Sequence, residues 1–227
     1  MRLISDFDGV IADLSERYYQ VYRWSLTEIA PDEQAITVLS KADFWELKRQ
    51  QTPRDIIGKK SGLTEKQIPK FIELRNENAH SLENMVHDRL IDGSLEALQI
   101  AQDLGWEIMT VTMRRTSELA EMFKLYPELG DFIAGDRRFT MPDAAERDRD
   151  LELKPLLLAE TLITLPQSSQ TWMVGDSEAD IRAAQSQDIP IISVLSGIRS
   201  RESLEAYEPD FIVDNLFEAV KLIQSEL

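Results

Sequence analysis

The hydrophobic pattern divides the chain into two kinds of segment. Between residues 15 and 88, apolar residues recur at helical spacing, and no strand-like alternation interrupts them. After residue 88, short apolar runs that suit buried strands alternate with helical stretches, which predicts a mostly parallel sheet with helices on both faces. The predicted fold is therefore a doubly wound α/β core, residues 1–14 and 89–227, with an all-helical unit inserted at 15–88.

Turn residues and helix caps give these elements approximate limits. Proline and glycine end most of them, and Thr52-Pro53 is predicted to begin a short helix. We predict strands at residues 3–5, directly before Asp6, and at residues 106–112, 132–134, 171–174, 190–195 and 211–213. Helices are predicted at 14–30, after 40, at 53–58, after 64, and at 93–104, 117–125, 154–162, 180–187 and 216–224, with a polar loop at 135–150.

Composition narrows the class of protein. The 227 residues are 43% hydrophobic and include no cysteine, so disulfides, thiolate catalysis and cysteine metal sites are excluded. Only Met1 and Arg2 precede the first strand, and no run approaches the roughly 18 apolar residues of a membrane span. We therefore expect a cytoplasmic protein without a signal peptide or membrane anchor.

The net charge of −16 is unevenly distributed. Residues 15–88 hold 12 acids and 11 bases, so almost all of the negative charge belongs to the rest of the chain, which makes a poor nucleic-acid surface. Within the helical segment, five bases lie close together with one acid among them. They could form a solvated helix face or attract a small anionic substrate. These bases are Lys48, Arg49, Arg54, Lys59 and Lys60.

Two carboxylates, Asp6 and Asp8, follow the first predicted strand. Acids one residue apart repel each other unless a cation lies between them or one of them is protonated. An isolated Asp-x-Asp-Gly is also typical of a solvated turn, so this motif alone leaves both interpretations open.

Other reactive side chains are predicted at the same edge of the sheet. In open α/β sheets, ligands bind at the carboxyl ends of the strands. Asp6, Thr112 and Asp176 follow or end predicted strands, and Lys154 begins a predicted helix. Carboxylates are ligands that Mg²⁺ prefers, while a hydroxyl and an ammonium can hold phosphoryl oxygens. The combination favours a magnesium-dependent phosphoryl-transfer site.

Four short motifs follow one another along the chain: Asp6-Phe7-Asp8-Gly9-Val10, Thr112, Lys154-Pro155 and Val174-Gly175-Asp176-Ser177-Glu178-Ala179-Asp180. Their order resembles the four motifs of the haloacid dehalogenase superfamily, in particular its phosphoglycolate phosphatase and β-phosphoglucomutase branch. The resemblance extends to the tail at 209–213 and implies a Rossmann-like core with a helical cap domain inserted after the first motif.

The resemblance also implies a role for each motif residue. Asp6 would be the nucleophile that forms an aspartyl-phosphate, and Asp8 the general acid and then the base. Thr112 and Lys154 would hold the phosphoryl group. Mg²⁺ would be held by Asp6, the backbone carbonyl of Asp8 and Asp176, with Asp180 in support. The presence of Asp8 favours phosphate chemistry over the metal-free dehalogenase branch.

The resemblance also implies a role for a residue of the helical cap, and the sequence departs from the family pattern at two places. Arg54 lies where relatives place a basic cap residue that reaches the substrate. Met113 stands where many relatives have Asn or Ser, which leaves its backbone N–H as a phosphate contact. The loop at 135–150 is longer and more charged than usual in the branch. His80 and His87 are interpreted as structural or solvated.

These observations predict a Mg²⁺-dependent phosphatase for a small phosphorylated metabolite, such as phosphoglycolate or a sugar phosphate. A phosphomutase of the β-phosphoglucomutase type and a non-catalytic binding or assembly protein on the same fold are the alternatives. Neither a nucleic acid nor a membrane is expected as a partner. The sequence does not identify the substrate or the oligomeric state.

Overall fold

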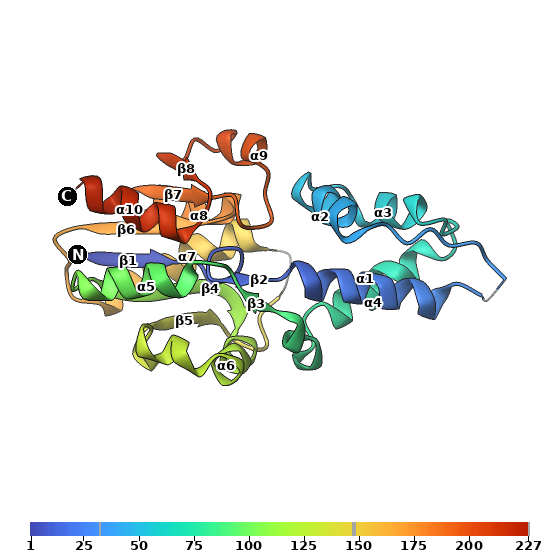
Figure 1. The fold of residues 1–227 in the computed structure, drawn as a ribbon, viewed down its shortest axis with the longest axis horizontal. Coiled ribbons are helices and arrows are strands. Elements are labelled where there is room, and N and C mark those ends of the chain that lie inside the picture. Colours follow the sequence, from blue (N-terminus) through green and yellow to red (C-terminus); the bar gives the residue numbers. More distant parts are fainter. Residues whose placement is uncertain (32, 147–148, 227) are drawn as a thin grey trace. The chain divides into compact units, whose positions relative to one another are not determined.

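The computed structural model describes residues 1–31, 33–146 and 149–226 (Figure 1). They form two compact units: a core unit of Met1–Asp13 with Arg89–Leu227, and a helical unit of Leu14–Asp88. The predicted fold class, a doubly wound α/β core with an inserted all-helical segment, is confirmed. The role of the helical unit as a cap stays a prediction.

The core unit contains a six-stranded parallel sheet in the order β5-β4-β1-β6-β7-β8. Its strands are β1 (Arg2–Ser5), β4 (Glu107–Arg115), β5 (Arg138–Met141), β6 (Thr171–Gly175), β7 (Ile191–Val194) and β8 (Phe211–Val213). The first strand lies in the middle of the sheet, between β4 and β6. The residue that follows β1 is thereby placed at the centre of the carboxyl edge.

Side chains from consecutive positions of β1 pack on opposite faces of the sheet. Leu3 and Ile4 are both fully buried, but each belongs to a different hydrophobic cluster. A strand covered on both faces needs apolar residues at consecutive positions, which explains the uninterrupted apolar run. One face is covered by α5 (Ser94–Asp103), α6 (Thr116–Leu125) and α10 (Leu216–Glu226). The other is covered by α7 (Asp150–Thr164), α8 (Glu178–Gln185) and α9 (Arg201–Glu205).

The edge of the sheet beyond β4 differs from the prediction. Residues 132–134 are not a strand; they follow the short helix η2 (Pro127–Asp131). The predicted loop at 135–150 instead contains η3 (Gly135–Arg137) and the edge strand β5, while residues 147–148 lie outside the described part. The error arises because β5 is a half-buried edge strand with two polar residues, and apolar runs mark only strands buried on both faces.

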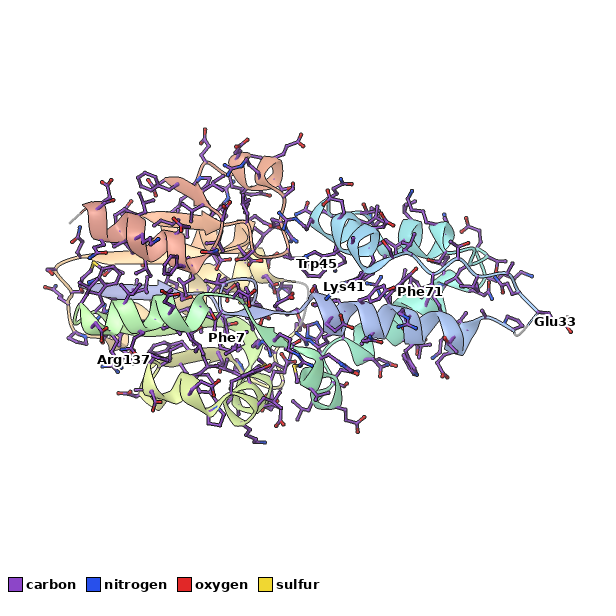
Figure 2. The ribbon with its side chains drawn as sticks, viewed as in Figure 1. Phe7, Glu33, Lys41, Trp45, Phe71 and Arg137 are labelled. Carbon is purple, nitrogen blue, oxygen red and sulfur yellow. The ribbon has the colours of Figure 1, made fainter. Side chains whose placement is uncertain are left out.

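The helical unit contains α1 (Ser15–Ile29), α2 (Lys41–Arg49), α3 (Arg54–Lys60), α4 (Ile68–Asn78) and η1 (Leu82–His87). Aromatic rings form much of its interior. Tyr22 and Phe44 stack with their ring centroids 4.6 Å apart, and Phe71, labelled in Figure 2, meets Tyr22 edge-on at 6.3 Å. The unit thus has a hydrophobic core of its own, separate from the two clusters of the sheet.

Both ends of the helical unit are fixed by local contacts. On the core side, β2 (Ala12–Asp13) pairs antiparallel with β3 (Arg89–Leu90). Inside the helical unit, Arg17 donates from Nε to Asp88 Oδ1 at 2.8 Å and from Nη1 to the carbonyl of Ala79 at 2.6 Å. Arg17 and Asp88 are almost completely buried, so this ion pair joins the start of α1 to the last residue of the unit.

Among the described residues, no helix combines the length and the apolar character that a membrane span requires.

Candidate active site

Asp6 is held in a single orientation at the carboxyl end of the central strand. Its side chain is 8% exposed, and both of its carboxylate oxygens have partners. The Phe7 N–H donates to Oδ1 at 2.7 Å, and the Lys154 ammonium lies 2.7 Å from Oδ2. Phe7 anchors this turn, because its ring is buried in the core unit against Phe123, 6.1 Å away between centroids (Figure 2).

Lys154 connects two carboxylates of the site. Its ammonium lies 2.7 Å from Asp6 and 2.5 Å from Asp180, and its side chain is 1% exposed. Burial disfavours the charged ammonium, but Asp180 and Asp6 outweigh this effect and raise the pKa of Lys154. The helix α7 begins at Asp150, so Lys154 lies in its second turn and not at its start, as the sequence had suggested.

Asp176 and Asp180 are positioned by the turn after β6. Asp180 forms a capping box at the start of α8: Ser177 donates to its Oδ2 from the hydroxyl at 2.6 Å and from the backbone N–H at 3.1 Å. Asp176 accepts a hydrogen bond from the Ile198 N–H at 2.7 Å. Ile198 was not anticipated, since a backbone donor leaves no mark in the sequence.

Three buried carboxylates from this edge could hold one metal ion. Asp6, Asp176 and Asp180 each offer an oxygen, and these oxygens lie within 4.8 Å of one another. With Lys154 counted, the four groups carry a formal charge of −2 when all are ionised, which a divalent cation would balance. Burial raises the pKa of Asp6 most, and the neighbouring carboxylates raise it further, although the Lys154 ammonium lowers it. Hard carboxylate oxygens in this arrangement fit Mg²⁺.

Glycines surround the Asp176 carboxylate closely. A Cβ on Gly197 would lie 1.9 Å from Asp176 Oδ2, and one on Gly9 would lie 2.2 Å from the same atom. Gly9 also has φ +73°, a conformation in which side chains are strained. The Ser196 hydroxyl donates to the Gly9 carbonyl at 2.7 Å and joins the two glycine loops. No larger residue could stand at either position without displacing this carboxylate.

Asp8 has surroundings different from those of Asp6. Its side chain is 30% exposed, and Arg114 donates from Nε to its Oδ1 at 2.5 Å. The Arg114 side chain is 2% exposed, and its guanidinium lies over the Phe7 ring, 5.2 Å from the centroid. Arg114 was missed from the sequence, although it lies two residues after the motif Thr112 and a basic residue there could have been considered for the same edge.

Thr112 and Met113 lie within β4, not at its end, because the strand continues to Arg115. Pairing with β5 is irregular between Val111 and Arg115, and the Thr112 hydroxyl accepts a hydrogen bond from the Arg114 N–H at 3.2 Å. This local bond lies within the irregular part of the pairing. Thr112 is 1% exposed and Met113 is half-buried, and their phosphate contacts stay predictions.

Arg54 belongs to the helical unit, where it is the first residue of α3 and half-buried. The helix predicted to begin at Thr52-Pro53 has Pro53 as its N-cap and begins at Arg54, which differs from the prediction by one residue. His80 packs edge-on against Tyr18, with centroids 6.3 Å apart. The role of Arg54 in substrate binding stays a prediction.

The raised pKa of Asp176 gives the protein a testable pH dependence. Burial, followed by the Asp180 carboxylate, raises this pKa from 3.8 to about 7. Folding therefore favours protonated Asp176, so its stabilising contribution is complete below pH 3.8 and is lost as the pH rises through about 7. In EDTA, we expect the melting temperature to fall over this range, and Mg²⁺ to raise it most at the upper end.

Thermal melts from acidic to neutral pH, with EDTA or Mg²⁺, measure this effect. Asp176→Asn provides the control, because it removes one ionisable carboxylate and one metal ligand at the same position. Both the pH dependence and the Mg²⁺ stabilisation should be smaller in this variant. A Mg²⁺ effect that is independent of pH, or equal in the variant, would contradict the assignment of Asp176 as a ligand.

Comparisons with known proteins agree with this geometry. A family model described as HAD-hydrolase-like matches residues 152–219, which include Lys154, Asp176 and Asp180. Pyrophosphatase PpaX from Bacillus mycoides is 26% identical over 144 residues, which cover 60% of this chain and 62% of that protein. The matched segment thus spans less than two thirds of this curated relative.

Solved structures extend the likeness of fold to nearly the whole chain. A predicted phosphatase from Clostridium acetobutylicum has a TM-score of 0.69 at 20% identity and covers 100% of this chain and 98% of that one. A predicted phosphoglycolate phosphatase from Haemophilus somnus has a TM-score of 0.66 at 17% identity, with 98% and 97% coverage. The family model thus matches the part of the core unit that carries Lys154, Asp176 and Asp180, and the solved structures show that the chain shares their fold.

Proposed function

We propose that this protein is a Mg²⁺-dependent phosphatase that hydrolyses a small phosphate monoester through an aspartyl-phosphate at Asp6. The observation that carries the proposal is the arrangement around Asp6. A buried carboxylate at the centre of the sheet edge lies 2.7 Å from an ammonium, within a group of three acids that suits a divalent cation. Such a site can place a nucleophile beside a phosphoryl group and neutralise the charge of that group.

In the first step, an oxygen of Asp6 attacks phosphorus, and the bond between phosphorus and the ester oxygen breaks. Lys154, fixed between Asp6 and Asp180, keeps the nucleophile oriented and offers a positive charge to the phosphoryl oxygens. Mg²⁺ held by Asp6 and Asp176 would screen the repulsion between the carboxylate and the phosphate dianion. Thr112 would donate its hydroxyl to another phosphoryl oxygen.

Asp8 completes the proton balance in both steps. It gives a proton to the departing ester oxygen, which leaves as an alcohol. It then takes a proton from the water that attacks the aspartyl-phosphate, which releases phosphate and restores Asp6. The contact with Arg114 suits an ionised Asp8, the form that the second step requires. The first step requires protonated Asp8, so we infer that this contact loosens when the substrate binds.

The proposed substrate class rests on the resemblance to the haloacid dehalogenase superfamily and on the negative charge of the core unit. The superfamily and the phosphate-related names of the relatives support a small phosphorylated metabolite, including phosphoglycolate, sugar phosphates and pyrophosphate. The acidic core unit disfavours nucleic acid as a substrate. The helical unit, with its near-neutral charge and its basic cluster, would act as the cap that selects among small anions.

A panel of phosphate monoesters and inorganic pyrophosphate tests the proposal. We expect phosphate release from at least one member with Mg²⁺ and its loss in EDTA, since the acids need a cation to work beside a phosphate dianion. Isomerisation of a sugar phosphate in the presence of a bisphosphate primer would identify a phosphomutase instead. A protein that is inert across the panel would contradict the proposal and favour a binding or assembly role.

A further inference from the structure

The loop that follows β7 places a backbone donor on one of the proposed metal ligands. Ile198 lies in this loop, and its N–H donates to Asp176 Oδ2 at 2.7 Å. Gly197 lies so close to the same carboxylate that a Cβ at this position would come within 1.9 Å of Oδ2. The orientation of the Asp176 carboxylate therefore depends on the position of this loop.

An ion pair fixes the loop at the residue after Ile198. Arg199 donates from Nε to Glu178 Oε2 at 2.5 Å and from Nη2 to Glu178 Oε1 at 2.8 Å. The two side chains are 20% and 11% exposed, so salt screens this pair less than it screens an exposed pair. Glu178 is the first residue of α8, two positions after Asp176. Because a contact of two parallel hydrogen bonds restricts both distance and angle, it holds the loop and the start of α8 in one geometry.

Asp176 differs from the other acids of the site in the origin of its donor. Asp6 accepts a hydrogen bond from Phe7, the next residue, and Asp180 accepts one from a residue three positions earlier. The local backbone keeps these donors in place. Ile198 lies 22 positions from Asp176 along the chain, so contacts made by its loop must hold this donor against the carboxylate.

We propose that the Glu178–Arg199 ion pair positions Asp176 for Mg²⁺, and that it thereby sets the affinity of the site for this ion and its preference for Mg²⁺ over Ca²⁺. The inference rests on the proposed Mg²⁺ site, but it gives a positioning role to two residues outside that site. Removal of a group that orients a metal ligand typically costs about 10–100-fold in metal affinity. Mg²⁺ requires near-ideal octahedral geometry, whereas Ca²⁺ accepts flexible arrangements and carboxylates that bind through one or both oxygens. A loosely held Asp176 should therefore weaken Mg²⁺ binding more than Ca²⁺ binding.

Arg199→Met separates positioning from a simple effect of charge. Arg199 is a cation that interacts electrostatically with Asp176, so the loss of its charge alone would strengthen the binding of Mg²⁺. Loss of positioning has the opposite sign. We expect Mg²⁺ to bind Arg199→Met at least about tenfold more weakly than the parent, with a smaller loss for Ca²⁺. Arg199→Lys keeps the charge without the paired geometry, and its Mg²⁺ affinity should lie between those of the parent and Arg199→Met.

Calorimetric titration of MgCl₂ and of CaCl₂ into the metal-free, full-length protein measures these affinities without turnover. Asp176→Asn identifies the binding that belongs to the site, as opposed to binding elsewhere on an acidic protein. Arg201→Met is the matched control for the loss of one positive charge. Arg201 is an exposed residue of α9, and its contact with Glu205 is 3.8 Å long. This variant should keep the parent's affinity for both ions.

The outcomes distinguish this inference from the proposed function. Absence of Mg²⁺ binding to the parent would contradict the metal site itself, and the proposed function with it. If the parent binds Mg²⁺, equal or tighter binding by Arg199→Met would overturn the positioning role alone. Equal losses for the two ions, or an equal loss in Arg201→Met, would overturn it as well. Thermal melting in EDTA shows whether Arg199→Met is folded; if it is not, Arg199→Lys is judged by the same criteria.

Discussion

Asp6→Asn is expected to lower phosphate release by at least about a thousandfold, because an amide is a poor nucleophile and leaves no route to a covalent intermediate. The substitution keeps the shape of the side chain, so the hydrogen bond from the Phe7 N–H can persist. Initial rates on the best ester of the panel, with saturating Mg²⁺, measure the effect. Thermal melting of the variant shows whether the fold is retained.

Asp131→Asn is the control for this change, since Asp131 is an exposed aspartate of η2 and lies outside the site. It should keep the parent rate. Substantial activity in Asp6→Asn would exclude the aspartyl-phosphate mechanism, even if the protein is a phosphatase. The metal site would then need another nucleophile, such as an activated water molecule.

Asp8→Asn is expected to separate the two chemical steps. Loss of a general acid costs about 10²–10⁴-fold, but only when the leaving group needs a proton. We therefore expect a large loss with alkyl phosphates and a much smaller loss of the first step with p-nitrophenyl phosphate, whose leaving group departs as a stable anion. Burst kinetics of p-nitrophenol release measure the first step directly.

The second step should become slow in the same variant, because no base activates the attacking water. Phosphoenzyme should then accumulate, and mass spectrometry of the acid-quenched protein should show one added phosphoryl group on the peptide that contains Asp6. The double variant Asp6→Asn with Asp8→Asn should show none. Equal losses with both leaving groups, together with no trapped phosphoenzyme, would contradict the role of Asp8 as acid and base.

The central part of the fold could be predicted from the sequence for a physical reason. Strands buried on both faces must be apolar throughout, and β1, β6 and β7 therefore stand out as short apolar runs between turn residues. The carboxyl ends of these strands share one edge of the sheet, so the sequence alone predicts that Asp6 and Asp176 lie near each other. Their closeness within a group of three acids agrees with that expectation.

Elements at the periphery and polar contacts over long sequence distances were harder to predict. The edge strand β5 is half-buried and polar, so its composition resembles that of a loop. The contact between Asp8 and Arg114 joins residues 106 positions apart, and nothing local to either one indicates the other.

The antiparallel pairing of β2 with β3 brings together the two chain segments that enter and leave the helical unit. Asp13 lies opposite Arg89 in an antiparallel ladder, and the whole helical unit connects these two residues. An antiparallel pair of this kind is ordinarily closed by a turn of two residues. The helical unit is thus an enlarged hairpin turn. The free-energy cost of closing a loop rises only slowly with its length. A segment of another size could therefore replace the helical unit without altering β2 and β3.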